Sequence, residues 1–226
     1  MSSTVLVPGL LCDRFVWAPV LARIDAHVAD LTTQTTIAEM ARDTLAAHPG
    51  PLRVAGHSMG ARVAMEMARQ APERVERLVL LDTGIHPLKP GEIEKRARVI
   101  ALAREQGMAA LAEAWLPGMV HAPNRDNGAL MQGLTEMVLR MDPDLHERQI
   151  MALVTRPDAA AYLPEIACPT LLVVGKQDAW SPPAQHEDML ALLPDARLEV
   201  VDDAGHFAPV EQPDAVAALV SGFLGN

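Results

Sequence analysis

Short runs rich in Val, Leu and other apolar residues alternate along this sequence with segments of helical periodicity. Such alternation is typical of βα units, which build a mostly parallel sheet with helices on its faces. The segments expected to form strands are 4–7, 27–29, 53–56, 77–82, 170–175 and 197–201. Helices are expected at 37–46, 61–70, 185–192 and 214–223. The pattern therefore predicts an α/β fold with about six strands.

One connection interrupts this rhythm, because about 85 residues separate two expected strands where βα and αβ loops normally take only a few. We expect a helical lid of about four short helices at 85–164, inserted into a core made of 1–84 and 165–226. Two amphipathic stripes support helices in this segment. They consist of Ile93, Ala97, Ile100 and Ala101, and of Leu130, Met131, Leu134, Met137, Val138 and Met141.

Size and charge limit the kinds of partner. The 226 residues fit one domain, and the formal net charge of −10 disfavours nucleic acid and anionic membranes. Pro8 and Gly9 interrupt the first apolar run, so it reads as a strand and turn rather than a signal peptide, and no stretch is long enough to span a membrane. With Cys12 and Cys168 expected to be reduced, we predict a cytoplasmic monomer or homodimer that acts on a small molecule.

The strand expected at 53–56 runs into Gly56-His57-Ser58-Met59-Gly60 and then into a helix. This is the strand, turn and helix context that a G-x-S-x-G nucleophile requires. Any Cβ at Gly56 or Gly60 is expected to collide with neighbouring elements, because the turn is so sharp. The turn would raise the Ser58 hydroxyl above the edge of the sheet. Ser58 is therefore the candidate nucleophile.

A serine hydroxyl needs a base to take its proton, and that base needs an acid to orient it. His206 follows the last expected strand in a short loop that contains glycine, and Asp178 follows the strand expected at 170–175. The chain order serine, acid, histidine fits this arrangement. Asp82, which ends another strand, is a second candidate acid, with a turn or helix-capping role as the alternative. The side chains of Asp202 and Asp203 should point away from the adjacent histidine, while His57, His86 and His186 are expected to be structural or to line the pocket.

Stabilising an oxyanion takes two backbone N–H donors. One is expected from Met59, the residue after the nucleophile, and the other from the loop after the first strand. Leu10 is the candidate there because Gly9 lets the backbone approach closely, with Leu11 as the neighbouring alternative. No His and carboxylate pair outside the triad has the spacing of metal ligands, so we expect no metal or other cofactor.

With Gly9, GHSMG, LLDTG, GKQD and GHF in this order, the sequence resembles the α/β-hydrolase family along nearly its whole length. The resemblance implies the fold, a Ser58, Asp178 and His206 triad, and acyl-transfer chemistry. The sequence departs from the family pattern in two places. Pro8 stands where many members have histidine, and the chain starts at what would be the third strand of the fold.

The resemblance leaves the substrate open. We expect an ester, thioester or lactone of small to medium apolar size, with substrate-binding residues Trp17, Arg62, Met137, Trp180 and Phe207. Arg62 lies four residues after the serine, a spacing similar to that of menaquinone-pathway lyases that make succinyl-hydroxycyclohexadiene-carboxylate, and pairing with Glu66 is its plainer alternative. Lyase chemistry is thus a second hypothesis. A receptor that keeps the triad but turns over slowly is a third.

Overall fold

The computed structural model describes residues 2–225 and is built on one parallel sheet. Its six strands lie in the order β2-β1-β3-β4-β5-β6, and every neighbouring pair is parallel. The strands are β1 (Ser3–Val7), β2 (His27–Val28), β3 (Leu52–His57), β4 (Val75–Leu81), β5 (Thr170–Gly175) and β6 (Ala196–Val201). The predicted α/β fold with about six strands is confirmed.

The strand register brings the carboxyl ends of the strands to one edge of the sheet. Val7 of β1 pairs with Gly56 of β3, and Gly175 of β5 pairs with Val201 of β6. All six residues of β5 are buried, as expected for a strand covered on both faces. In open sheets of this kind, sites form beyond the carboxyl ends of the strands.

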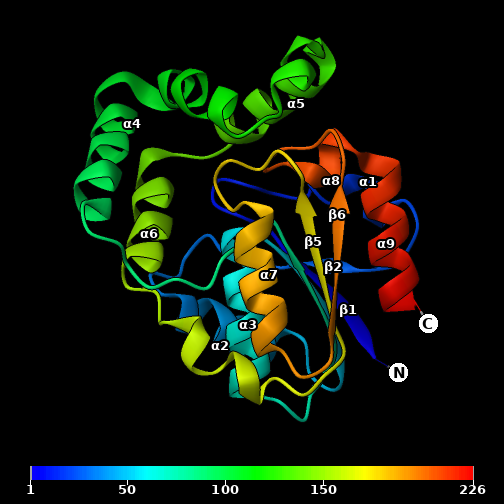
Figure 1. The fold of residues 1–226 in the computed structure, drawn as a ribbon. Helices are drawn as coiled ribbons and strands as arrows, with labels where there is room; N and C mark the ends of the chain where they lie inside the picture. Colours follow the sequence, from blue (N-terminus) through cyan, green and yellow to red (C-terminus); the bar gives the residue numbers. More distant parts are fainter. Residues whose placement is uncertain (1, 226) are drawn as a thin grey trace.

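Helices cover both faces of the sheet, as Figure 1 shows. Helices α2 (Ile37–Ala47), α3 (Met59–Gln70) and α7 (Pro183–Leu192) lie on one face, while α1 (Ala18–Leu21) and α9 (Pro213–Gly225) lie on the other, next to the short α8 (Ala208–Glu211). Thr36 and Glu39 form a capping box that starts α2. Within residues 2–225, no helix is long and apolar enough to cross a membrane.

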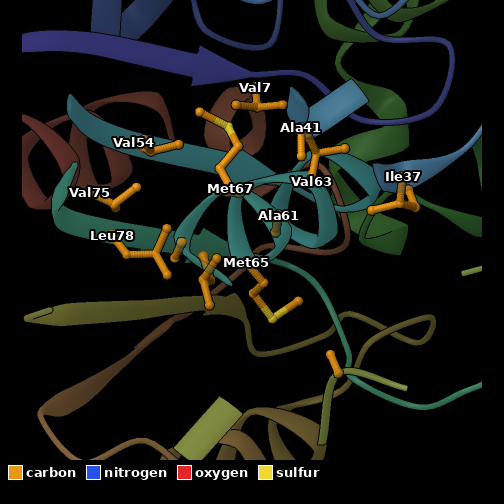
Figure 2. Packing of buried hydrophobic residues seen from close by; sticks show 14 of the residues in the cluster. Val7, Ile37, Ala41, Val54, Ala61, Val63, Met65, Met67, Val75 and Leu78 are labelled. Carbon is orange, nitrogen blue, oxygen red and sulfur yellow. The ribbon is translucent and has the colours of Figure 1, made fainter. Parts of the chain in front are cut away.

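The core on the α3 face is built from small and flexible side chains, and Figure 2 shows part of it. Val63 and Met67 of α3 are fully buried in one cluster with Val54 of β3 and Leu78 of β4. Burying one such side chain contributes roughly 1.5–3 kcal/mol. A core of this kind fits a chain in which only 3% of the residues are aromatic.

The connection between β4 and β5, residues 82–169, is helical but differs from four short helices. It contains α4 (Glu92–Trp115), α5 (Gly128–Leu139) and α6 (Pro143–Val154), with 3₁₀ turns η1 (Leu116–Gly118), η2 (Ala122–Asp126), η3 (Ala159–Ala161) and η4 (Leu163–Glu165). Helix α4 has 24 residues and is broken at Gly107, whose φ is 83°. In Figure 1, α4 and α5 lie beyond the ends of strands β5 and β6.

Of the two predicted stripes in this connection, one is confirmed and one is wrong. Leu130, Leu134 and Met137 of α5 are buried in a hydrophobic cluster with strands and α9. On α4, by contrast, Ile93 is 52% exposed. Charged residues of this part of α4, including Arg96, instead line a cavity. Apolar spacing alone cannot identify such a face, because most of the residues that line the cavity from it, including the half-buried Glu92 and Arg96, are charged.

Candidate active site

Ser58 lies at the junction of β3 and α3 in a strained backbone conformation, with φ 55° and ψ −116°. The two glycines around it allow the strand to turn this tightly. A Cβ at Gly56 would lie 2.4 Å from Gly60 O, and one at Gly60 would lie 2.1 Å from Val7 O. Both distances are far inside van der Waals contact, so the predicted collisions follow from the geometry.

Three side chains from three different loops meet at this junction. Ser58 Oγ lies 2.8 Å from His206 Nε2, and His206 Nδ1 lies 2.8 Å from Asp178 Oδ2. These partners set the tautomer, because the carboxylate accepts the Nδ1 proton and leaves Nε2 free to accept from the hydroxyl. The structure therefore brings together the three residues that the sequence predicted as a triad, in one continuous chain of hydrogen bonds.

Asp178 is held as a carboxylate by its surroundings. Its Oδ1 accepts hydrogen bonds from the backbone N–H groups of Trp180, at 2.8 Å, and Ser181, at 2.9 Å. Burial alone would raise the pKa of Asp178, but His206 and these donors outweigh it and lower the pKa below its usual value. Asp178 is thus ionised at neutral pH and oriented toward the imidazole.

The loop that carries His206 is fixed by contacts that the sequence analysis missed. His206 N–H donates to Met119 O at 2.8 Å, and His57 Nε2 donates to His206 O at 2.7 Å. The carboxylate of Glu211 accepts from Gly205 N–H at 3.0 Å and from Phe207 N–H at 3.1 Å. The backbone around the histidine is therefore held on both sides. These bonds join distant segments through backbone atoms, so no sequence motif marks them.

Asp82 does not contact the histidine that it was considered to orient. It is fully buried, and its Oδ1 accepts from Gly175 N–H at 2.9 Å. Its Oδ2 is 3.8 Å from His57 Nε2. Burial, followed by the charge of Asp178, raises the pKa of Asp82 well above its usual value. Its contacts tie β4 to β5 instead.

The three histidines expected to be structural or to line the pocket, His57, His86 and His186, are buried or line the cavity. Burial and the nearby His206 lower the pKa of His57 to about 3, and burial lowers that of His186 to about 4. His186 Nε2 accepts from Thr83 N–H at 3.1 Å, while His86 lies in the cavity wall. None of the three contacts the Ser58 hydroxyl within the described residues.

Two backbone N–H groups are available beside Ser58. In the described part of the chain, neither Leu10 N–H nor Met59 N–H donates to another residue, and both residues line the cavity. Leu11, the alternative donor, is already engaged, because its N–H donates to Gln149 Oε1 at 2.8 Å. The free N–H groups are thus those of the two residues predicted from the sequence.

A cavity of about 640 Å³ opens above Ser58. Its walls come from the loop after β1, from α3 and from the connection between β4 and β5. Apolar side chains in it include Leu10, Leu111, Trp115, Met119 and Phe207. Trp115 was missed because it lies far along the chain from every motif.

The predicted substrate-binding residues divide into two groups. Arg62, Trp180 and Phe207 line the cavity. Trp17 and Met137 do not line the cavity, since both are fully buried in a hydrophobic cluster that includes residues of α5 and α9, and their prediction as substrate-binding residues is wrong. A residue close to a motif in sequence, or on an amphipathic stripe, is expected to be buried. Neither feature tells whether it lines the cavity or packs in the hydrophobic core.

Arg62 does not pair with Glu66, contrary to the plainer expectation. Glu66 accepts from Arg69 Nη2 at 2.6 Å and from Gln70 Nε2 at 2.8 Å. Arg62 Nη2 instead donates to His86 O at 3.0 Å, across the cavity wall. The guanidinium therefore belongs to the cavity rather than to the outer surface of α3.

Comparisons with known proteins agree with this geometry. A hydrolase of 2-hydroxy-6-oxononadienedioate/2-hydroxy-6-oxononatrienedioate from Pseudomonas sp is 32% identical over 76% of this chain, which spans 62% of that relative's length. N-formylmaleamate deformylase from Pseudomonas putida is 25% identical, covering 98% of this chain and 88% of its own. The structure of a thermophilic esterase from Thermogutta terrifontis, with malate bound, has a TM-score of 0.90 at 29% identity, covering 100% of this chain and 90% of that one. Residues 4–219 match the alpha/beta hydrolase family, from the first strand into the last helix, and the chain belongs to that family.

Proposed function

We propose that this protein is a serine hydrolase that cleaves a carboxylic ester, thioester or lactone through an acyl-enzyme intermediate. The observation that carries the proposal is the hydrogen-bonded chain from Ser58 through His206 to Asp178 at the base of a cavity. Relatives described as a hydrolase, a deformylase and an esterase support the same class of reaction.

In the first step, His206 Nε2 takes the Ser58 proton as Oγ attacks the acyl carbon. The N–H groups of Leu10 and Met59 donate to the negatively charged carbonyl oxygen that forms. The histidine then gives its proton to the departing alcohol, thiol or ring oxygen, and the acyl group remains on Ser58. Water, deprotonated by the same nitrogen, releases the acid and restores the serine.

Asp178 is assigned a positioning role in this cycle. Its carboxylate holds the Nδ1 proton of His206, which keeps Nε2 directed at the serine and stabilises the imidazolium during attack. The lowered pKa of Asp178 keeps this carboxylate charged throughout the neutral range.

We also propose that residues 85–164 act as a lid on a core formed by 1–84 and 165–226. Met119 and Trp115 from this segment line the cavity, and Met119 O bonds the histidine loop. Residues 85–164 contain six methionines, of which Met119 alone is in the described cavity wall, so an adaptable methionine surface is not part of the proposal.

A second candidate, a lyase acting on an acidic substrate, is favoured by one observation: Arg62 lines the cavity one helical turn from Ser58. Lyase and hydrolase chemistry differ in their products. A hydrolase releases an acid and an alcohol or thiol with uptake of water, whereas a lyase releases an unsaturated product without it.

The test is steady-state hydrolysis of p-nitrophenyl esters with acyl chains of two to sixteen carbons, combined with labelling by a fluorophosphonate. We expect turnover of short and medium chains, and mass spectrometry should place the label on Ser58. Ser221→Ala, altered on the outer helix α9, is the matched control and should still be labelled. Absence of both turnover and label would overturn the hydrolase proposal and leave the lyase and receptor alternatives.

A further inference from the structure

The cavity above Ser58 is unusually cationic for this chain. Five of its lining residues are lysine or arginine and one is acidic, although the whole chain has a formal net charge of −10. The cations lie on α3, on α4 with the loop before it, and after α6, and they are Arg62, Lys89, Lys95, Arg96 and Arg156. Such a cavity attracts an anion even though the protein as a whole repels it.

The one acidic residue, Glu92, is already paired. Its two carboxylate oxygens accept from Arg156 Nη1 and Nη2, both at 2.8 Å, and Oε1 also accepts from Arg96 Nε at 2.8 Å. Burial would raise the pKa of Glu92, but hydrogen bonds from Arg156, from Lys89 N–H and from Arg96 hold it at about 2. One carboxylate is therefore shared between two arginines, which leaves nothing to neutralise a third.

Arg62 is that third arginine. Its guanidinium has five donors, and the described residues provide one partner, His86 O, which also accepts from Arg156 Nε at 3.1 Å. Within residues 2–225, Arg62 forms no ion pair. Burial and the neighbouring charge of Arg156 lower the pKa of Arg62 to about 9, so its charged form lacks compensation. A bound anion would neutralise the charge of Arg62.

We propose that Arg62 is the centre of an anion subsite, and that the substrate carries a carboxylate at a distance from the bond that Ser58 attacks. The inference rests on the proposed function and adds the substrate class: half-esters or thioesters of dicarboxylic acids, or lactones that bear a carboxylate. Ser58 immediately precedes α3 and Arg62 lies in the first turn of that helix, and both residues line the same cavity. A short acyl chain can span such a site, and a guanidinium binds a carboxylate through two parallel hydrogen bonds.

The first experiment compares 4-nitrophenyl hydrogen glutarate with 4-nitrophenyl 5-methylhexanoate, in which an isopropyl group replaces the carboxylate. We expect the wild-type protein to prefer the glutarate in kcat/KM. Arg62→Met should lower kcat/KM for the glutarate by roughly 10- to 100-fold, the range for a charge-assisted hydrogen bond, with a smaller change for the neutral ester. Arg62→Lys should restore part of the preference. The succinate and adipate half-esters then report the chain length that best spans the site.

Arg104→Gln is the matched control, because it removes one positive charge from an exposed part of α4 outside the cavity wall. It should leave the ratio of the two kcat/KM values unchanged. An equal fall of that ratio in Arg104→Gln and Arg62→Met would mean that overall charge, rather than a subsite, sets the preference. No preference for the glutarate in the wild-type protein, or an unchanged one in Arg62→Met, would overturn the proposal.

A binding experiment separates this inference from the hydrolase proposal. In the Ser58→Ala protein, isothermal titration calorimetry should detect glutarate more strongly than its diamide, and Arg62→Met should remove the difference. Binding of glutarate by a protein that hydrolyses no ester would retain the subsite and reject the hydrolase. Ester turnover by the wild-type protein without binding of glutarate would support the hydrolase and reject the subsite. Tighter binding of inorganic phosphate than of succinate, glutarate and adipate would overturn the choice of a carboxylate.

Discussion

Gln149 of α6 accepts a hydrogen bond from Leu11 N–H through its side-chain oxygen, at 2.8 Å. Its amide nitrogen donates to Leu31 O at 3.3 Å, so the connection between β4 and β5 fixes the loop after β1. Leu11 has a left-handed backbone with φ 56°, which a leucine rarely adopts without support. This bond uses the Leu11 donor and leaves Leu10 N–H free beside Ser58.

From this relationship we predict that Gln149→Leu slows the reaction although the residue is distant in sequence from every motif. The Leu11 N–H would lose its buried acceptor, at a cost of roughly 1–3 kcal/mol in the free energy of unfolding. Displacement of the loop should lower kcat by roughly 10- to 100-fold, less than the loss of a whole oxyanion donor, with KM changed little. Gln132→Leu, on the exposed side of α5, is the control. Wild-type kcat in a folded Gln149→Leu protein would contradict the role.

Ser58→Ala should abolish ester hydrolysis and leave the fold intact. The Ser58 hydroxyl bonds only to His206 within the described residues, so its loss removes little packing. We expect kcat to fall by a factor on the order of 10⁴ or more, with Tm nearly unchanged. Turnover measured beside circular dichroism melting checks both parts, and hydrolysis at the wild-type rate would refute the assignment of the nucleophile.

Exchanging each of the two candidate acids for asparagine should separate their roles. Asp178→Asn replaces the acceptor of the His206 Nδ1 proton, so the wrong tautomer should form and kcat should fall by roughly 10⁴. Asp82→Asn keeps an oxygen for Gly175 N–H and should leave kcat within a few-fold of wild type. The reverse result would assign the orienting role to Asp82.

Asp82 should also make stability depend on pH. Its pKa in the folded protein is well above the value of about 3.9 that it has in an unfolded chain, so the folded state holds the proton more tightly. Its contribution to stability is fully present below about pH 4 and declines as pH rises through the folded pKa. Asp82→Asn should therefore gain stability over wild type as pH increases. Urea denaturation between pH 5 and 8 tests this, with exposed Asp202→Asn as control. Parallel pH curves for wild type and Asp82→Asn would exclude the effect.

Much of the fold could be predicted from the sequence because strands buried on both faces are nearly continuous apolar runs. Such a run precedes Ser58, and another precedes Asp178, so the sheet order places the residues after them at one edge. The glycines at 56 and 60 could also be interpreted from the sequence, because a Cβ at either position would collide with backbone atoms. Local pattern and global fold agree in these segments.

The parts that could not be predicted depend on which partner covers a side chain. Trp17 and Met137 are residue types that often line apolar pockets, yet both are buried in a hydrophobic cluster and do not reach the cavity. Glu211 and Gln149 look like ordinary surface residues, but they satisfy buried backbone N–H groups. Contacts of this kind join residues far apart in the chain, and no spacing rule reveals them.

Helix α4 lines the cavity mainly with charged residues on one side of Gly107 and with apolar residues on the other. Before Gly107, charged residues such as Arg96 face the cavity. Beyond that break, Leu111 lines the cavity and also packs with Ala112 into the hydrophobic cluster. Exchange of the charges at 89–96 thus changes what the cavity attracts while the packed turns stay the same. Lys89 and Lys95 are exposed, so we expect their exchange to alter the charge of the cavity without disturbing the hydrophobic cluster.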